Sequence, residues 1–393
     1  MFYQRNIFPA LLDHLSKKQI TVLTGTRRTG KTTLLKALME RSVINQKIYF
    51  DLERIDNREF FSEKNYENIA YALTQRGFRL DEPLLIAIDE IQMASNLPSV
   101  VKYLYDTYSF KFILTGSSAY YLKNTFSESL AGRKKLFEIY PLTFGEVLTF
   151  NSVSYAPMTD WQELRFMEAE YQRLKTYYES YIRFGGFPEV VLAESEADKK
   201  DLISDILSSY INYDIAILAD IRKSADIYKL VKLLSIRIGT RLDISKLTSF
   251  TQLSRPTVEN YLALLEQSYL IKTIPVLAKS PDREIVKARK VYFTDNGIAN
   301  FAAELSSGAQ FENAVFNQLH PHADIAYYQQ KNGREIDFIV NHQQAIEVKE
   351  TATESDLKNV VDLAQKLDIT ESYVVGRHPN QQFTHMIWGG MIV

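Results

Sequence analysis

The 393-residue sequence predicts a multidomain α/β protein whose first domain is built on a parallel β-sheet. Two patterns predict that sheet. A β-rich run at residues 20–24 leads through a glycine-containing loop into a helix, and an apolar run at 84–88 ends in two acids. A strand that is apolar throughout is typical of a sheet covered on both faces. One hydrophobic core rarely grows past about 250–300 residues, so we expect more than one domain.

The composition is that of an ordinary globular protein, and it excludes several kinds of chemistry. Hydrophobic residues make up 46% and charged residues 24%, and cysteine is absent. Disulfides, thiolate metal sites and a cysteine nucleophile are therefore impossible. No apolar stretch approaches the roughly 18 residues that span a bilayer, and Arg5 interrupts the only signal-like segment. We expect a cytoplasmic protein with no membrane partner.

The strand at 20–24 is followed directly by a GxxxxGK[ST] loop and then by an apolar helix at 34–39. The loop reads Gly25, Thr26, Arg27, Arg28, Thr29, Gly30, Lys31, Thr32 and Thr33. Its backbone N–H groups and the helix N-terminus favour an anion. We predict that ATP or GTP binds here, with Lys31 on the β- and γ-phosphates and the Thr32 hydroxyl on Mg²⁺. The alternative is a chance match in a glycine-bearing turn.

The apolar run at 84–88 ends in Asp89 and Glu90, at what would be the carboxyl end of a buried parallel strand. A nucleotide site needs an acid there. We expect Asp89 to bind Mg²⁺ through water and Glu90 to orient or deprotonate the attacking water. Without the preceding loop, the same pair would indicate only a solvated turn.

Two later segments supply further candidates for the nucleotide site. A third strand at 111–115 ends in small hydroxyl residues, and Thr115 or Ser117 would hydrogen-bond the γ-phosphate or the water, unless the segment is a simple Ser/Gly turn. Arg133 follows an apolar helix, where it would reach across a subunit boundary as an arginine finger or remain a surface arginine.

The order of these motifs resembles one family. The loop, the strand ending in Asp-Glu, Leu-Thr-Gly-Ser-Ser, Ala-Gly-Arg and then residues 140–146 are similar to the prokaryotic AAA-type ATPases that carry a conserved C-terminal region of uncharacterised function. Gly-Gly-Phe-Pro-Glu at 185–189 resembles the signature that opens that region. The resemblance implies a RecA-like sheet with an additional strand and a homo-oligomer. It implies no settled substrate.

The middle of the chain predicts helices and a hairpin. Three helices, at 227–238, 244–253 and from 254 onward, precede β-like segments at 271–274 and 290–293, an order that resembles a winged helix. Residues 222–297 hold 14 Lys and Arg against 7 Asp and Glu, which favours DNA as a partner. The expected DNA contacts are Arg255, Thr257, Asn260, Lys279, Arg283 and Lys287. A winged helix that docks proteins is the alternative.

The last hundred residues contain an acidic constellation. Asp337 begins or precedes one strand of a hairpin, Glu347 and Lys349 lie two apart on the next, and Glu312 lies on an earlier helix. This pattern resembles the PD-(D/E)xK nucleases, which implies Mg²⁺ on Asp337 and Glu347, completion of the acidic cluster by Glu312, and a catalytic Lys349. Ile336 departs from the motif's proline. Residues 298–393 hold 6 Lys and Arg against 12 Asp and Glu, which weakens the case for DNA affinity, and an inactive docking fold is the alternative.

We therefore expect an ATPase domain at 1–154, a helical lid or connector at 155–225, a winged-helix-like domain at 226–297 and a PD-(D/E)xK-like α/β domain at 298–393. The leading hypothesis is ATP hydrolysis coupled to DNA binding and metal-dependent cleavage. One alternative is an ATP-governed switch or scaffold whose nuclease fold binds a protein partner. Another is DNA remodelling without cleavage.

Overall fold

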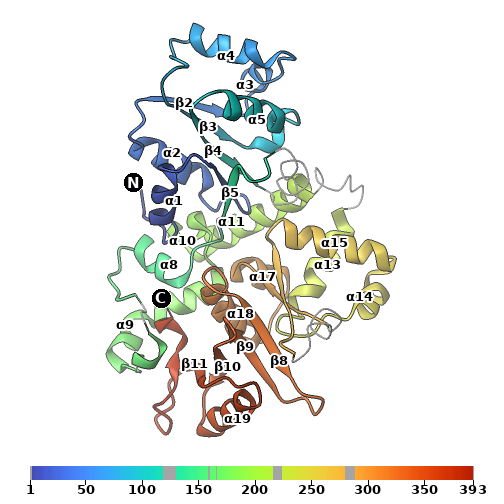
Figure 1. Ribbon diagram of the computed structural model, residues 1–393. Coiled ribbons are helices and arrows are strands. Elements are labelled where there is room, and N and C mark those ends of the chain that lie inside the picture. The colour runs from blue at the N-terminus through green and yellow to red at the C-terminus, as the bar shows by residue number, and fades with distance from the viewer. Residues whose placement is uncertain are drawn as a thin grey trace. The chain divides into compact units, whose positions relative to one another are not determined.

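The computed structural model describes residues 2–117, 130–157, 160–164, 166–215, 224–278 and 288–392 (Figure 1). The chain forms two compact units. The first comprises residues 1–140, 213–220 and 267–269, and the second comprises 141–212, 221–266 and 270–393. Among the described residues, every helix is too short or too polar to cross a membrane.

The first unit is built on a five-stranded sheet. Its strands are β1 (Ile20–Thr24), β2 (Gln46–Asp51), β3 (Leu84–Asp89), β4 (Phe110–Gly116) and β5 (Lys134–Glu138). Their order is β2-β3-β4-β1-β5, and every neighbouring pair is parallel. Because β4 lies between β1 and β3, the sheet has the additional strand that the resemblance implied.

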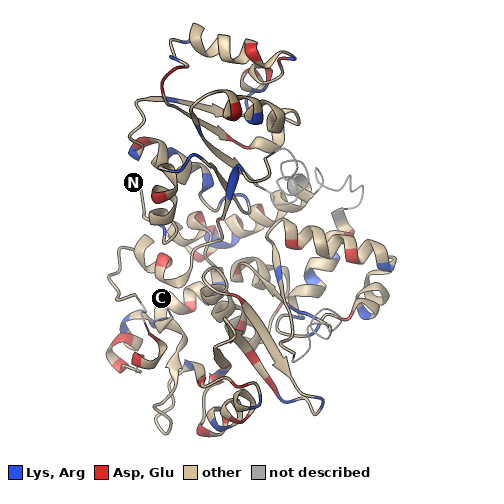
Figure 2. Cartoon of the chain, in the orientation of Figure 1, with Lys and Arg blue, Asp and Glu red and all other residues tan. Residues whose placement is uncertain are grey.

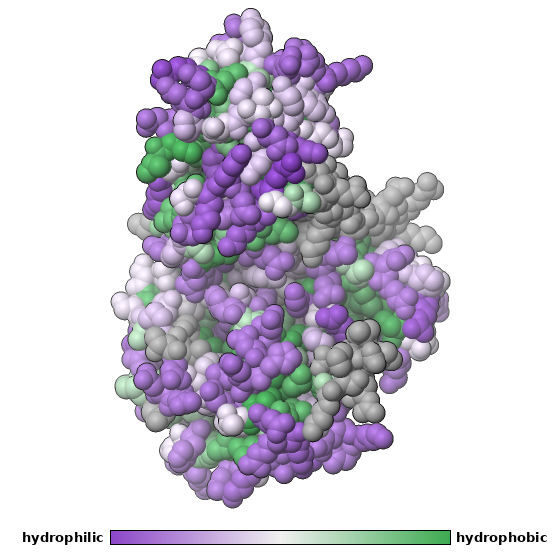
Figure 3. All heavy atoms as spheres, in the orientation of Figure 1, coloured by the Kyte–Doolittle hydropathy of each residue, from purple (hydrophilic) through white to green (hydrophobic). Residues whose placement is uncertain are grey.

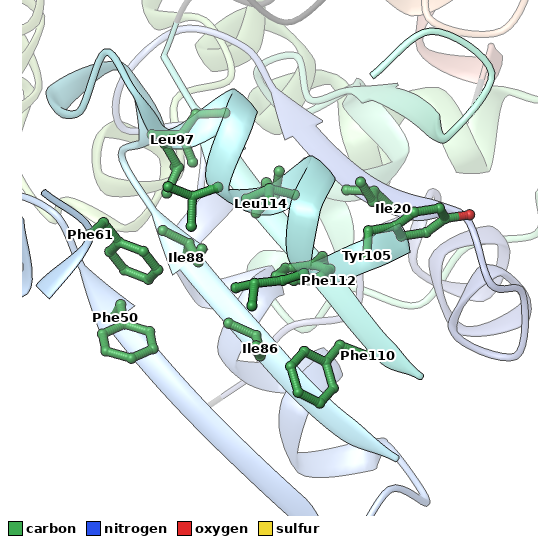
Figure 4. Packing of buried hydrophobic residues seen from close by; sticks show 14 of the residues in the cluster. Ile20, Phe50, Phe61, Ile86, Ile88, Leu97, Tyr105, Phe110, Phe112 and Leu114 are labelled. Atoms are coloured by element: carbon green, nitrogen blue, oxygen red, sulfur yellow. The ribbon is translucent and has the colours of Figure 1, made fainter. Parts of the chain in front are cut away.

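Helices cover this sheet on both faces. They are α1 (Phe8–Leu15), α2 (Lys31–Arg41), α3 (Ile55–Phe60), α4 (Tyr66–Gln75) and α5 (Leu97–Thr107), with a 3-10 turn, η1 (Ile91–Met93). Alternate strand residues enter opposite cores: Ile86 and Ile88 belong to the same core as Leu97 and Tyr105 of α5 (Figure 4), whereas Leu85 and Ala87 belong to a core with residues of α1 and α2. This burial on both faces explains why β3 and β4 are apolar in sequence.

The second unit begins with helices. These are α8 (Phe144–Phe150), η2 (Trp161–Glu163), α9 (Glu168–Phe184), α10 (Pro188–Leu192), α11 (Glu196–Ser209) and the π-helical η3 (Tyr210–Ile215), which continues into the first unit. Then follow α13 (Ser224–Ser235), α14 (Ile244–Thr251), α15 (Arg255–Gln267) and the antiparallel strands β6 (Ile271–Ile274) and β7 (Lys290–Phe293). Both strands lie where the sequence predicted them.

A five-stranded mixed sheet forms the C-terminal part of this unit. After α17 (Asn296–Ala302) and α18 (Ser307–Leu319) come β8 (Ile325–Gln329), β9 (Glu335–Val340), β10 (Gln344–Thr351), α19 (Glu354–Gln365), β11 (Glu371–His378), β12 (Ile387–Trp388) and η4 (Gly389–Met391). The order is β12-β11-β10-β9-β8. β9 is antiparallel to both β8 and β10, whereas β11 is parallel to both β10 and β12. The helix α19 makes the crossover that the parallel pair requires.

The Gly-Gly-Phe-Pro segment has a packing role in the second unit. Gly185 has φ +77°, and a Cβ there would lie 2.3 Å from an Asp295 carboxylate oxygen. Gly186 donates its N–H to Asp295 Oδ2 (2.8 Å) and accepts from Leu142 N (2.7 Å). Burial raises the pKa of Asp295 to about 6, although the backbone N–H groups oppose this rise. The two glycines therefore allow the chain to approach a buried carboxylate closely.

Hydrophilic side chains cover most of the face drawn in Figure 3. This agrees with the burial of most large apolar residues in the cores.

Candidate functional site

The loop after β1 depends on two glycines. Gly25 has φ +151°, and a Cβ there would lie 2.1 Å from Ile139 O of the first unit. Gly30, at φ +91°, caps the start of α2 in the left-handed region. Thr29 Oγ1 donates to Thr26 O (2.9 Å) and closes the loop. At position 25, only glycine fits without displacing the neighbouring backbone. At position 30, glycine avoids the strain that a positive φ imposes on other residues.

Lys31 lies inside the curve of this loop. It is 4% exposed, and its Nζ donates to Gly25 O (3.0 Å) and Thr26 O (2.7 Å). Arg28 (φ +63°) and Thr33 lie exposed nearby, and Arg27 is partly buried. The ammonium is therefore held where the loop N–H groups and the helix N-terminus converge.

The carboxylate of Asp89 collects hydroxyl groups from three elements. Thr32 Oγ1, at the start of α2, and Tyr49 OH, on β2, donate to its Oδ2 at 2.7 and 3.0 Å. Thr115 Oγ1, on β4, donates to its Oδ1. Burial, then the charge of Asp89, raises the pKa of Tyr49, so this phenol stays a donor. The loop and the ends of β2, β3 and β4 therefore meet at one carboxylate.

Glu90 follows β3 in a left-handed backbone conformation, with φ +55°. Its N–H donates to Thr115 Oγ1 (3.1 Å), and its carboxylate accepts from Gln92 Nε2. The same amide donates to Ser117 Oγ (2.9 Å). The structure thus brings together Asp89, Glu90, Thr115 and Ser117, the four residues singled out at the ends of the two strands.

Arg133 lies at the amino-terminal ends of the strands, opposite the nucleotide loop. Its carbonyl accepts from Ile20 N at the start of β1 (2.8 Å), whereas the loop follows the end of that strand. Its guanidinium contacts Asp106 through Nε (2.8 Å) and Nη2 (3.0 Å), and this pairing lowers the pKa of Asp106. Because β5 is parallel to β1, a residue that precedes β5 lies away from the nucleotide loop of its own chain.

Glu312 lies on α18, Asp337 on β9, and Glu347 and Lys349 on β10, which contacts both α18 and β9 (Figure 1). Figure 2 colours acidic residues of this unit red. Phe338 pairs with Ile346, so Asp337 and Glu347 are the next residues along β9 and β10, and Val348 N donates to Asp337 Oδ2 (2.9 Å). Lys349 Nζ lies 2.5 Å from Glu347 Oε1. Glu312 of α18 accepts from the hydroxyl of Tyr292 (2.6 Å).

Electrostatic coupling joins these carboxyl groups. Burial and then the charge of Asp337 raise the pKa of Glu347 to about 8, although Lys349 opposes the shift. Burial and then Asp337 also raise the pKa of Glu312 to about 7. Burial lowers the pKa of Lys349, but the neighbouring carboxylates outweigh that effect and raise it. Burial and mutual repulsion therefore favour the protonated form of Glu312 and Glu347.

Sequence reasoning missed three neighbours of the candidate sites: Tyr49, Gln92 and Lys290. Lys290 is 1% exposed, and its Nζ lies 3.4 Å from Glu335 Oε2 and 3.8 Å from Asp337 Oδ1. Burial lowers its pKa, but the charges of Asp337, Glu312 and Glu335 together raise it above the usual value. In the sequence, this lysine ends a basic stretch and gives no signal of burial.

Within the described residues, no three His, Cys, Asp or Glu side chains are arranged to hold a metal ion. The donor sets at both sites nevertheless fit Mg²⁺, which needs only one or two carboxylates and otherwise keeps water. In the first unit, Thr32 and Asp89 offer a hydroxyl and a carboxylate. In the second, Asp337 and Glu347 offer two carboxylates, and Glu347 Oε2 is buried without a hydrogen-bond partner in the part of the chain described.

The expected DNA contacts are only partly described. Arg255 is exposed and pairs with Glu259 (2.9 Å), Thr257 Oγ1 lies 2.7 Å from Ser254 Oγ, and Asn260 is exposed. Thr257 and Asn260 lie on the side of α15 away from its buried Val258 and Leu262, whereas Arg255 is the first residue of the helix. Lys279, Arg283 and Lys287 lie outside the described residues.

The strand order and the loop define the first unit as a P-loop nucleoside triphosphatase fold. Residues 17–148 match the AAA domain family, and residues 175–309 and 307–388 match two domains of unknown function, DUF8612 and DUF4143. These findings support an AAA-type P-loop ATPase. They assign no activity to the C-terminal part.

Two relatives that align with most of this chain are described as uncharacterized proteins. One from Methanocaldococcus jannaschii is 29% identical over 363 residues, which cover 88% of this chain and 78% of the relative. One from Haemophilus influenzae is 27% identical over 399 residues, which cover 95% of this chain and 94% of the relative.

Solved structures with some likeness include two from Aeropyrum pernix. The ORC1 protein in complex with DNA has a TM-score of 0.34 and 14% identity, over 77% of this chain and 92% of that chain. The ADP form of ORC2 has a TM-score of 0.37 and 12% identity, over 70% of this chain and 87% of that chain. Both scores are low, so these likenesses carry no argument about function.

Proposed function

We propose that the chain hydrolyses ATP at the loop between β1 and α2. The observation that carries the proposal is that the hydroxyl groups of Thr32 and Thr115 both donate to the buried carboxylate of Asp89. In P-loop proteins, that position holds the metal beside the γ-phosphate. ATP and Mg²⁺ are therefore the proposed ligands.

The loop residues have distinct proposed roles. Lys31 exchanges its two loop carbonyls for phosphate oxygens and neutralises charge on the β- and γ-phosphates. The N–H groups of 25–33 cradle the phosphates. Thr32 and Asp89 hold Mg²⁺, which supplies charge neutralisation when bound.

The residues after β3 and β4 are proposed to act on water. Glu90 orients or deprotonates the attacking water once its carboxylate leaves Gln92. Thr115 and Ser117 hydrogen-bond the γ-phosphate or that water. Phosphoryl transfer depends mainly on positioning and charge stabilisation, which is what these polar groups provide.

We further propose that Arg133 acts on the nucleotide of a neighbouring subunit in a homo-oligomer. Arg133 lies at the amino-terminal end of the strands, away from the nucleotide loop of its own chain. An arginine finger acts on the nucleotide of another subunit, so this position favours the proposal. The arginine would exchange Asp106 for the developing charge of the transferred phosphoryl group.

A turnover assay tests the water-activating role. The variant Glu90→Gln keeps the size of the side chain and removes its basicity, so we expect it to bind ATP and to hydrolyse it roughly 10²–10⁴-fold more slowly. Glu53→Gln, an exposed acid beyond β2, is the matched control and keeps the wild-type rate. Normal turnover by Glu90→Gln would show that another group activates water.

A second candidate function concerns the C-terminal sheet. We propose that Asp337 and Glu347 hold one Mg²⁺, that Lys349 positions water or steadies the phosphate, and that Glu312 completes the acidic cluster of a PD-(D/E)xK-like phosphodiesterase. The observation that favours it is the adjacency of Asp337, Glu347 and Lys349 across β9 and β10. The helices α13, α14 and α15 with β6 and β7 would act as a winged helix that binds DNA.

The rival to cleavage is a nucleotide-governed switch in which this cluster only binds a partner. A plasmid-nicking assay with Mg²⁺ or Mn²⁺ separates the two. We expect the wild type to nick and Asp337→Ala and Lys349→Ala not to. Equal nicking by all three proteins would identify a contaminant and remove the cleavage proposal.

A further inference from the structure

A buried lysine lies among the carboxylates of the C-terminal sheet. The side chain of Lys290, the first residue of β7, is only 2% exposed. Its Nζ lies 3.4 Å from Glu335 Oε2, 3.8 Å from Asp337 Oδ1 and 5.2 Å from the centre of the Tyr327 ring. Within the described part of the chain these ion pairs are long, and no hydrogen bond of good geometry satisfies the ammonium. A buried ammonium that its partners satisfy only in part is costly, so its position requires a reason.

Neighbours on both sides fix Lys290 in this place. Asn313 of α18 donates Nδ2 to Phe293 O (3.0 Å) and accepts from Phe293 N (2.9 Å) at the other end of β7. Tyr327 of β8 donates its hydroxyl to Ala288 O (2.5 Å) just before the strand. Lys290 is therefore held over β9 by the fold and is not a mobile surface side chain.

A second atom at the cluster also lacks a partner. Glu347 Oε2 is buried and makes no hydrogen bond among the described residues, while its Oε1 faces Lys349. The incompletely satisfied Lys290 ammonium and the unpaired Glu347 Oε2 thus belong to one cluster with Asp337. A hydrated cation satisfies both, since the metal takes carboxylate oxygens and its water accepts from an ammonium.

The charges of the cluster limit how many ions it can take. Its four carboxylates are Glu312, Glu335, Asp337 and Glu347, and its two ammonium groups are Lys290 and Lys349. With all four carboxylates ionised, as a bound cation would favour, the net charge of −2 is neutralised by one divalent cation. A second divalent cation would leave two excess positive charges in a buried place, whereas without Lys290 it would leave only one.

We propose that Lys290 is a built-in cation of this cluster, which replaces a second metal ion and limits the site to one divalent cation, held by Asp337 and Glu347. The inference rests on the proposed C-terminal site and not on the ATPase. It assigns Lys290 as a positioning residue that sets metal stoichiometry. In a substrate complex, its ammonium would also face the metal-bound water or phosphate oxygen.

Counting bound Mn²⁺ by electron paramagnetic resonance on the nucleotide-free full chain tests this. We expect one ion for the wild type and two for Lys290→Met, which has a similar shape and no charge. Lys349→Met is the matched control. Its side chain is 38% exposed and pairs with Glu347, so its loss should tighten the single ion without opening a second, buried place. Lys290→Arg keeps the charge and should bind one ion.

Two ions or none in the wild type would overturn the proposal, as would a folded Lys290→Met that still binds a single ion. If Lys290→Met does not fold, Glu335→Gln provides the test: we expect one ion, held at least about tenfold more weakly, or about 1.4 kcal/mol. Unchanged affinity in that variant would overturn the proposal. The ion count needs no DNA substrate. If the wild type binds one ion but cleaves no DNA, only the cleavage proposal is removed.

Discussion

Replacing Asp89 with asparagine removes the charge at the point where three elements meet. The carboxylate accepts from Thr32, Tyr49 and Thr115, and Asp89 is 3% exposed. Hydrogen bonds to charged groups contribute about 1.5–3 kcal/mol and neutral ones about 0.5–1.5 kcal/mol, so each contact weakens by about 1 kcal/mol. The three contacts together lose about 3 kcal/mol. Asparagine also avoids the cost of burying a charge, which offsets part of this loss. We expect the free energy of unfolding of Asp89→Asn to be about 1–3 kcal/mol lower than that of the wild type.

The larger expected effect is on magnesium. ATP alone should bind wild type and Asp89→Asn about equally in EDTA, because the phosphates contact the loop and Lys31. Adding Mg²⁺ should tighten ATP at least about tenfold in the wild type and much less in the variant. Thermal unfolding with ATP, with and without Mg²⁺, reports this, since ligand at about 100 times Kd stabilises by about 2.7 kcal/mol.

Asp51→Asn is the matched control for this experiment. Asp51 ends β2 and pairs in register with Asp89, but its carboxylate accepts only from the nearby Glu53 N (2.9 Å) among the bonds described. Mg²⁺ should tighten ATP binding by Asp51→Asn as much as it does in the wild type. If Asp89→Asn also keeps the full effect of Mg²⁺, the assignment of the metal to this carboxylate is wrong.

Three further predictions concern other residues. Arg133→Ala should assemble and bind ATP yet hydrolyse it roughly 10³-fold more slowly, and a full rate in the assembled state would remove the finger assignment. Gly25→Ala should lose ATP binding because its Cβ meets Ile139 O, whereas Gly77→Ala, also at positive φ but in open space, should bind normally; equal binding by both would refute the steric argument. The raised pKa of Glu347, about 8 against 4.5 unfolded, stabilises the fold most below pH 4.5 and progressively less as pH rises through 8. Thermal unfolding in EDTA should show that loss, and Glu347→Gln should reduce it; an unchanged pH profile in the variant would contradict the assignment.

The nucleotide loop and its acids were predictable because their signals are local. Residues 25–33 are contiguous, and the apolar run before Asp89 is explained by a strand buried on both faces. Tyr49 could not be found in this way, because its contact with Asp89 depends on β2 lying beside β3. The location of Arg133 at the amino-terminal ends of the strands likewise follows only from the parallel pairing of β5 with β1.

In the C-terminal sheet, the spacing of Asp337, Glu347 and Lys349 predicted their adjacency because a hairpin pairs such positions. Lys290 could not be predicted, since it reaches the cluster from a strand of another sheet. Its basic neighbours in the sequence indicate a solvated surface, and only the tertiary packing of β7 against α18 and β8 buries it.

Titration calorimetry with ATP and Mg²⁺ on the purified, folded chain tests whether the loop between β1 and α2 binds nucleotide. We expect saturable binding of one nucleotide per chain in the wild type, the same in Lys64→Ala, an exposed lysine, and none in Lys31→Ala. Absence of binding by the wild type, or wild-type binding by Lys31→Ala, would contradict this expectation.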